Sequence, residues 1–331
     1  MTLKSKKYFY GTEIALYQIA VRKGRSEKGE KFNHKIGAVM KSFINIIIGI
    51  SLISVLTDGA DAQQGSVTPL NGPILMQRVI PVSSIVQLRF INPGEDSDTG
   101  FFKKEESLNS GSYRLSGLFP IGENSAIEIA VPYQSHKTTY TFDGMSDSWE
   151  NESSELGNIS VIFIKGFKNR DSKSAKYLSL GLFLPTAGED AWEGTLDNYY
   201  DIPFFVDEVM IIKGLFSFVT NGSRSVLRVE GGVDTWIDVS DRNEDIEFFG
   251  RYGIGYTFLP SEKVSLHAEF VGYGIMIEDD LGDGSRFQNQ LALGARYQIG
   301  KFVPGMFFIK NFNDLGDLVS TGLGIELSMI L

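Results

Sequence analysis

Hydrophobic and polar residues alternate with a period of two through most of the chain after residue 80. A leucine occupies every second position from Leu178 to Leu184, and apolar residues occupy every second position from Leu323 to Leu331. This alternation is typical of β-strands with one apolar and one polar face. It predicts about 12 strands, at 84–91, 111–121, 125–134, 156–168, 175–185, 205–219, 225–239, 246–258, 263–277, 286–299, 302–311 and 318–331.

The length of these segments suits the crossing of a membrane. Most contain the ~9–11 residues, or slightly more, that a tilted strand needs to span a bilayer. After Gln63 no apolar run approaches the ~18 residues of a spanning helix. Strands can cross lipid only within a closed barrel, because every backbone N–H and C=O group must be paired there.

The connections between the segments alternate between short and long. The short ones are 122–124, 169–174, 221–224, 259–262 and 300–301, whereas 92–110, 135–155, 186–204, 240–245, 278–285 and 312–317 are longer or richer in charge. Tight turns on one side and loops on the other are typical of outer-membrane barrels, and a soluble sandwich has no reason to alternate in this way. We therefore predict an all-β fold, a transmembrane antiparallel up-and-down β-barrel of about 12 strands over 81–331.

The chain before the barrel has the parts of an export signal. A basic flank at Lys41, an apolar run over 43–56 and an A-x-A site at Ala60-Asp61-Ala62 follow one another in the order of a secretory signal peptide. We assign 40–62 to a cleavable signal peptide that directs the protein to the bacterial outer membrane; the alternative is a buried core helix. The mature chain would then begin at Gln63.

Two further segments complete the predicted organisation. Residues 1–39 are rich in Lys and Arg and fit neither a signal nor a barrel, so we interpret them as an upstream extension ahead of a true start at Met40. The alternative is a long basic region of the signal. Residues 63–80 are predicted to form a periplasmic N-terminal segment, and the sequence leaves open whether they plug the lumen.

Composition narrows the classes of function. The chain has no cysteine, which excludes disulfides, thiolate nucleophiles and cysteine-ligated metals, and it has only three histidines. A net charge of −10 disfavours a nucleic-acid partner. A mean hydropathy of −0.05 is compatible with a barrel whose inner face is polar. We expect neither a cofactor nor a metal.

If the apolar faces of the strands contact lipid, their parity assigns a set of polar side chains to the lumen. Both charge signs occur in this set, so the lumen either conducts solutes past charged side chains or is closed by an internal network of ion pairs. We favour conduction. The segments at 156–168 and 205–219 are apolar on both parities, so their faces stay unassigned. The lumen-lining candidates are Gln87, Arg89, Arg114, Glu128, Arg228, Glu230, Asp234, Glu247, Arg251, His267, Glu269, Gln288, Gln290, Arg296 and Glu326.

One pair of these candidates could suggest catalysis. His267 and Glu269 share one face of a strand, and Ser265 could be a nucleophile beside them. Residues two apart on a strand have limited direct contact, however, and parity turns His267 inward, away from lipid substrates. We therefore predict that the protein is not an enzyme, and we keep a membrane-embedded hydrolase as the least favoured alternative.

The stretch from Glu155 to Phe167, and the run from Leu178 to Leu184 that continues into Pro185-Thr186-Ala187-Gly188, resemble recurrent features of one outer-membrane family. This is the transporter family labelled as the MetA pathway of phenol degradation. Asn158 stands where the family usually has Asp, and Ala187 intervenes before Gly188. The resemblance covers most of 80–331 and implies passage of aromatic or other small organic compounds.

These observations lead to one favoured function and one alternative of a different class. We expect a porin-like outer-membrane transporter that passes small organic solutes, aromatic or not, by diffusion through a polar lumen. The alternative is a closed structural or adhesive barrel. The expected partners are outer-membrane lipid and lipopolysaccharide, a small-molecule solute, and the barrel-assembly machinery, which would bind the C-terminal strand. The acidic loops could contact lipopolysaccharide through divalent cations.

Overall fold

The structure is a computed structural model, and it describes residues 68–92, 97–98, 102–106, 110–142, 148–168, 174–191, 198–240, 246–276, 287–312 and 321–331. All of these belong to one compact unit formed by 60–279 and 285–331. The predicted signal peptide and the upstream extension lie outside the described residues, as do most of the acidic loop residues. None of the helices in the described ranges is long and apolar enough to cross a membrane.

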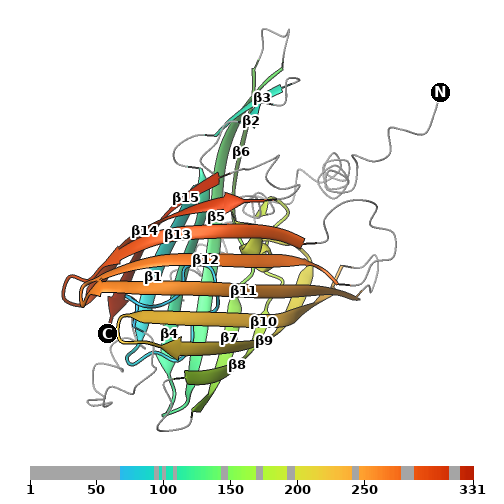
Figure 1. The fold of residues 1–331 in the computed structure, drawn as a ribbon. Coiled ribbons are helices and arrows are strands. Elements are labelled where there is room, and N and C mark those ends of the chain that lie inside the picture. The colour runs from blue at the N-terminus through green and yellow to red at the C-terminus, as the bar shows by residue number, and fades with distance from the viewer. Residues whose placement is uncertain are drawn as a thin grey trace, which may run out of the picture. The chain divides into compact units, whose positions relative to one another are not determined.

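The described strands close into a twelve-stranded antiparallel barrel (Figure 1). Each strand pairs with its neighbours in chain order, and β1 pairs with β15 to close the ring, with Ile85 opposite Ile330. The barrel strands are β1 (Ile85–Asn92), β4 (Gly111–Pro120), β5 (Ser125–Phe142), β7 (Ser160–Lys168), β8 (Ser174–Phe183), β9 (Val209–Asn221), β10 (Ser225–Asp238), β11 (Ile246–Ser261), β12 (Val264–Ile275), β13 (Phe287–Tyr297), β14 (Phe302–Asn311) and β15 (Thr321–Ile330).

The predicted all-β, up-and-down barrel is thus confirmed, and each predicted segment overlaps one barrel strand. Three additional short strands were not predicted. They are β2 (Ser97–Asp98), β3 (Phe102–Glu106) and β6 (Ser148–Leu156), and they extend the sheet beside the long strand β5. Their sequences are mostly polar and charged, so period-two apolar alternation could not reveal them.

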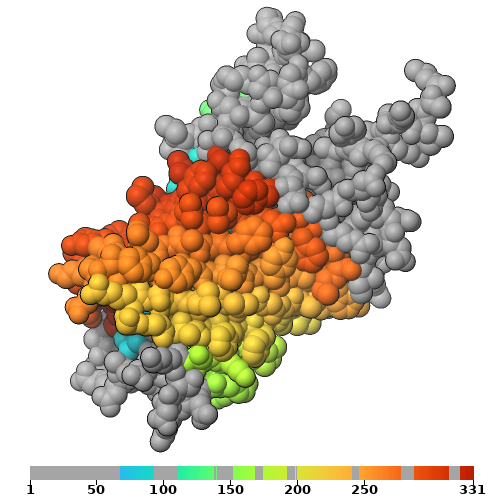
Figure 2. All heavy atoms as spheres, in the orientation of Figure 1, coloured from blue at the N-terminus to red at the C-terminus, as the bar shows by residue number. Residues whose placement is uncertain are grey.

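The alternation along each strand separates an apolar outer face from a more polar inner face. On β15, Ile325 and Leu327 are 60% and 46% exposed, whereas Glu326 between them is 5% exposed. The same contrast recurs around the barrel, for example between Ile254 and Arg251 on β11. Strands β10 to β14 form a continuous outer surface (Figure 2). A closed wall with apolar side chains outside is the arrangement that lipid requires.

The predicted segments 156–168 and 205–219, which are apolar on both faces, contain β7 and β9. One of the two apolar faces of each strand points into the barrel. On β7, Ile162 and Ile164 are buried while Val161 and Phe163 are about 40% exposed. On β9 the inner residues include Ile211 and Leu215. Part of the inner wall is therefore apolar, which the prediction of a polar lumen did not include.

Two pieces of chain occupy the barrel interior. The first, which we call the inner segment, is Leu70–Ile80, immediately before β1, and most of its apolar side chains are buried. The second, which we call the inner loop, is Asn198–Val206, between β8 and β9, and it contains the short 3-10 helix η3 (Tyr199–Phe204). The inner segment forms hydrogen bonds with residues of β1, β4, β5, β9, β10, β12 and β13, and the inner loop with residues of β4, β10 and β13.

Candidate functional site in the barrel lumen

Most of the polar residues assigned to the lumen by parity lie buried inside the barrel. Arg114 and Gln288 are half-buried, and Glu247 is exposed. Glu247 lies one residue from the start of β11, and parity gives the side of a strand but not the distance from its end. The buried members are Gln87, Arg89, Glu128, Arg228, Glu230, Asp234, Arg251, His267, Glu269, Gln290, Arg296 and Glu326.

Two carboxylates bind the backbone of the inner segment. The carboxylate of Glu269 accepts hydrogen bonds from the N–H groups of Ile74 at 2.5 Å, Leu75 at 2.7 Å and Met76 at 3.1 Å. Glu230 accepts one from the N–H of Gln77 at 3.0 Å. Without these acceptors, four consecutive backbone donors would be buried without strand partners, which is costly.

Arginines bind the carbonyl groups of the same segment. Arg296 donates to the carbonyl oxygens of Gly72 and Pro73, the latter at 2.9 Å, and Arg228 donates to that of Asn71 at 2.7 Å. Acidic residues of the wall thus meet N–H groups and basic residues meet C=O groups. This complementarity fixes the direction and register of the inner segment.

The side chains at the end of the inner segment continue the network. Arg78 forms an ion pair with Glu128 at 2.5 Å, and the side-chain amide of Gln77 donates to the same carboxylate at 2.7 Å. Lys213 of β9 donates to the amide oxygen of Gln77 at 2.7 Å. Lys213 was missed by parity because both faces of its strand carry apolar residues.

Apolar contacts also hold the inner segment. Ile74, Leu75 and Met76 belong to an apolar cluster that includes residues of the inner loop such as Phe204. Val79 and Ile80 pack in a second cluster. Burial of a large aliphatic side chain contributes roughly 1.5–3 kcal/mol. The apolar character of 70–80 was visible in the sequence, but its lack of alternation gave no sign of where it would dock.

The inner loop is fixed by a buried asparagine and by polar contacts to the wall. The amide of Asn158, between β6 and β7, donates to the carbonyl oxygens of Pro203 at 3.1 Å and Val206 at 2.6 Å. Asp201 forms an ion pair with Arg114 at 2.7 Å. Tyr200 donates its hydroxyl to Glu230 at 2.5 Å, and burial together with that carboxylate raises the pKa of Tyr200 well above its usual value. Tyr200 therefore stays a neutral donor.

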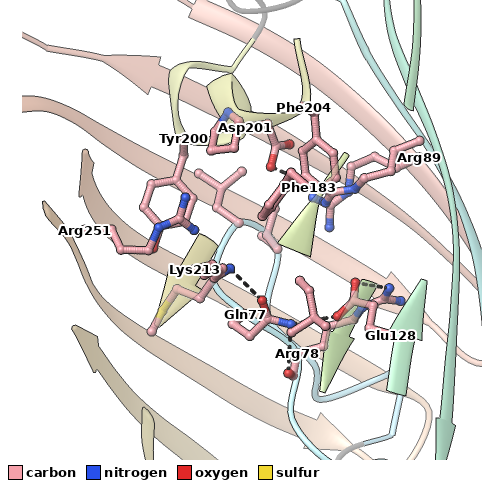
Figure 3. Close-up of a pocket in the computed structure, with 16 residues that line it drawn as sticks. Gln77, Arg78, Arg89, Glu128, Phe183, Tyr200, Asp201, Phe204, Lys213 and Arg251 are labelled. Carbon is pink, nitrogen blue, oxygen red and sulfur yellow. Dashed lines mark hydrogen bonds and ion pairs between the residues drawn. The ribbon is translucent and has the colours of Figure 1, made fainter. Parts of the chain in front are cut away.

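A cavity of about 40 Å³ separates the inner segment from the inner loop (Figure 3). The residues Ile74–Arg78 form one side and Tyr200–Phe204 part of the other. Wall side chains complete it, and five of the lining residues are cationic: Arg78, Arg89, Arg114, Lys213 and Arg251. Arg89, Arg114 and Arg251 are assigned to the lumen by strand parity, whereas the cavity itself depends on the two inserted segments and could not be foreseen.

Ion pairs connect the remaining charged residues around the wall. Arg251 binds Asp234 at 2.7 Å and lies over the rings of Tyr200 and Tyr273, 4.8 and 4.9 Å from their centroids. Glu326 binds Arg296 closely and Arg89 at a longer 3.3 Å. Removal of one partner from such a buried pair leaves an uncompensated charge, so these pairs lock the wall residues in place.

The residues considered for catalysis are arranged differently from a catalytic triad. Ser265 and His267 are hydrogen-bonded at 2.8 Å, but the other ring nitrogen of His267 meets the hydroxyl of Thr257 at 3.1 Å and not a carboxylate. Glu269 binds the inner segment instead. Within the described ranges, no group of three or more His, Asp or Glu side chains is placed to hold a metal ion.

The fold defined by this wall is that of the outer-membrane β-barrels. No protein-family model and no curated relative matches the sequence. Among solved structures, the chain is similar to an outer membrane channel from Pseudomonas putida F1, with 10% identity, a TM-score of 0.52, and 82% of this chain and 100% of that chain covered.

Two other solved structures align at lower TM-scores. One is the translocator domain of the autotransporter NalP from Neisseria meningitidis, with 12% identity and a TM-score of 0.41, over 74% of this chain and 87% of that chain. The other is a FadL homologue from Pseudomonas aeruginosa, with 11% identity and a TM-score of 0.38, over 80% of this chain and 95% of that chain. At these identities the likeness concerns the fold alone.

Proposed function

We propose that the protein is an outer-membrane channel that passes small organic solutes through its lumen, and that the inner segment must move for the lumen to open. The observation that carries this proposal is how the lumen is filled. A separate stretch of chain, Leu70–Ile80, occupies it, bound by hydrogen bonds and ion pairs to wall residues.

The width of the barrel explains why the lumen needs a separate stretch of chain to fill it. A barrel of about 8 strands can be filled by its own side chains, whereas about 16 strands leave an aqueous channel. Twelve strands leave a space that needs a filler. Within the described residues the filler is joined covalently to the wall through β1, so it can leave without unfolding the barrel. A purely structural barrel would gain more from side chains that bridge the wall directly, so we favour the channel over the structural or adhesive alternative.

The proposed export, membrane insertion and class of solute rest on the sequence. We propose export through the signal peptide at 40–62 to the outer membrane, insertion by the barrel-assembly machinery, and contact with lipid and lipopolysaccharide. The resemblance to the MetA-pathway transporter family supports aromatic or other small organic solutes. No catalytic role is proposed, because Ser265 and His267 are buried and their geometry lacks a carboxylate partner.

An engineered disulfide between the inner segment and the wall tests the proposal. A Cβ atom added at Gly253 would lie 3.1 Å from Cγ of Met76, close to the about 3 Å that separates Cβ from the far sulfur in a disulfide. The chain has no cysteine, so the double variant Met76→Cys/Gly253→Cys can form only this bond. Single-channel conductance in planar bilayers is recorded for the full chain, before and after reduction.

We expect little or no conductance from the oxidised protein and discrete conductance steps after reduction, because reduction frees the inner segment. Each single-cysteine variant is a matched control and should be insensitive to reductant. Equal conductance in the oxidised and reduced double variant would show that the inner segment does not gate the pore. A folded barrel that never conducts would favour the structural alternative.

A further inference from the structure

The cavity between the inner segment and the inner loop has more positive than negative side chains. Its lining includes five cations but only two carboxylates, Glu128 and Asp201. Both carboxylates are already engaged, since Glu128 binds Arg78 and Asp201 binds Arg114. The other three cations, Arg89, Lys213 and Arg251, have no carboxylate partner within the cavity lining.

The partners of these three cations outside the lining compensate them incompletely. Arg251 has Asp234, and Arg89 has only a 3.3 Å contact to Glu326, which Arg296 already binds. Lys213 donates to the neutral amide oxygen of Gln77. Asp234, Glu230 and Glu128 act on its ammonium group electrostatically, but among the described residues no carboxylate oxygen lies within 4 Å of it. A buried ammonium in such surroundings attracts an anion.

Two of these residues also carry buried donor atoms that lack acceptors. Nε and Nη1 of Arg89 and Nε of Arg251 are buried without a hydrogen-bond partner, although Arg89 is only 3% exposed and Arg251 only 6%. Buried donors without acceptors are rare and costly, and more so when they carry charge. Figure 3 shows Arg251 and Lys213 on one side of the cavity and Arg89 on the opposite side, with the ammonium group of Lys213 directed at Gln77.

We infer that this cavity binds the carboxylate group of a small organic anion, held by Lys213, Arg89 and Arg251. Planar guanidinium groups match the two oxygens of a carboxylate better than they match a spherical ion. A cavity of about 40 Å³ has room for roughly three water-sized groups, which is the size of a carboxylate head. The apolar side chains of Phe183, Phe204 and Ile162 lie beside it and suit a short hydrocarbon tail.

This inference deepens the proposed function, because it names the class of solute that would pass the lumen. It also separates the binding of a short carboxylate from the entry of a larger acid. A short carboxylate such as formate or acetate fits the cavity with the inner segment docked. A larger acid needs displacement of Ile74–Gln77, the residues that form the other side of the cavity. Binding and conduction are therefore separable measurements.

Equilibrium binding of acetate to the folded full chain in detergent tests the inference, measured by calorimetry in a low-salt zwitterionic buffer. We expect saturable binding that weakens at least tenfold in Lys213→Gln, because the variant loses the unpaired charge while its amide can still donate to Gln77. Lys213→Arg should retain most of the affinity. Lys263→Gln, which changes an exposed lysine in a turn, is the matched control and should bind like the unmodified chain.

The outcomes distinguish this inference from the channel proposal. Absence of acetate binding, or equal affinity of the Lys213→Gln and Lys263→Gln variants, would overturn the carboxylate site even if the barrel conducts. Chloride binding as tight as acetate would overturn the choice of a carboxylate. Saturable, Lys213-dependent binding by a barrel that never conducts would support the site while the channel proposal fails. Arg89→Gln gives a second, independent test of the same site, with the same expected loss.

Discussion

At the residue scale, Glu269 is the main anchor of the inner segment, because both of its carboxylate oxygens accept backbone N–H groups. The sequence pattern makes it a candidate partner of His267, but in the structure it binds the inner segment. Hydrogen bonds to charged groups contribute about 1.5–3 kcal/mol each. The side chain therefore affects the position of the inner segment far more than it affects the strand on which it lies.

Glu269→Gln should loosen the inner segment while leaving the barrel folded. The glutamine keeps one acceptor oxygen and replaces the other with a donor that faces N–H groups. A loss of about 1.5–3 kcal/mol corresponds to a roughly 10- to 150-fold rise in the released population. Trypsin cleavage after Arg78, followed by mass spectrometry, measures this population as long as docking is fast relative to cleavage.

Glu262→Gln, in an exposed turn near the same strand, is the control and should leave the rate of cleavage after Arg78 unchanged. An unchanged rate in Glu269→Gln would mean that the apolar clusters alone hold the segment.

At the element scale, Asn158 determines where the inner loop lies. It lies between β6 and β7, and both the NH₂ group and the oxygen of its side-chain amide form hydrogen bonds. The NH₂ group donates to Pro203 and Val206, while the oxygen accepts from the N–H groups of Thr186 and Ala187 at 3.0 and 2.9 Å. A carboxylate at this position could not donate to two carbonyl oxygens.

Asn158→Asp should therefore release the inner loop. The substitution places a carboxylate against two carbonyl oxygens and leaves them without donors, at a cost of about 1–3 kcal/mol each. Hydrogen exchange at the backbone amides of Asp201 and Phe205, which are bonded within the loop, should accelerate by at least tenfold. Asn124→Asp, in an exposed turn, should not change that exchange. Unaltered protection in Asn158→Asp would show that the other contacts of the loop, such as the ion pair of Asp201 with Arg114, hold it without the side chain of Asn158.

The same two elements show what the sequence could predict. The barrel strands were predictable because period-two alternation is a local property, and parity then placed residues such as Glu230 on the inner side. The docking of Leu70–Ile80 was not predictable, since it depends largely on complementarity with residues 50 to 224 positions away, as the contact of Gln77 with Glu230 illustrates. Lys213 stayed hidden because apolar neighbours on both faces removed the parity signal.

At the scale of the whole molecule, the exposed apolar face of the wall distinguishes a membrane barrel from a soluble one. Leu323, Ile325 and Leu327 are each exposed by 46% or more, and exposed large apolar residues occur on most of the other strands. A soluble protein rarely carries so large a continuous apolar surface, because it would promote association. In lipid, the same surface is the part of the molecule that stabilises the barrel.

A charge placed in this face should have an effect that depends on depth. Ile325 lies near the middle of β15, and Ile325→Arg should lower the free energy of unfolding by about 2–4 kcal/mol in lipid vesicles, because the arginine must leave water. Ile121→Arg changes an equally apolar and 51% exposed residue next to the turn after β4, where the cost should be about 0–1 kcal/mol. Urea unfolding of both variants in the same vesicles measures the difference. An exposed arginine on a soluble barrel would cost little at either position, so equal stabilities of the two variants would show that β15 does not face lipid. A lower stability of Ile325→Arg alone would place the middle of β15 within the hydrocarbon layer.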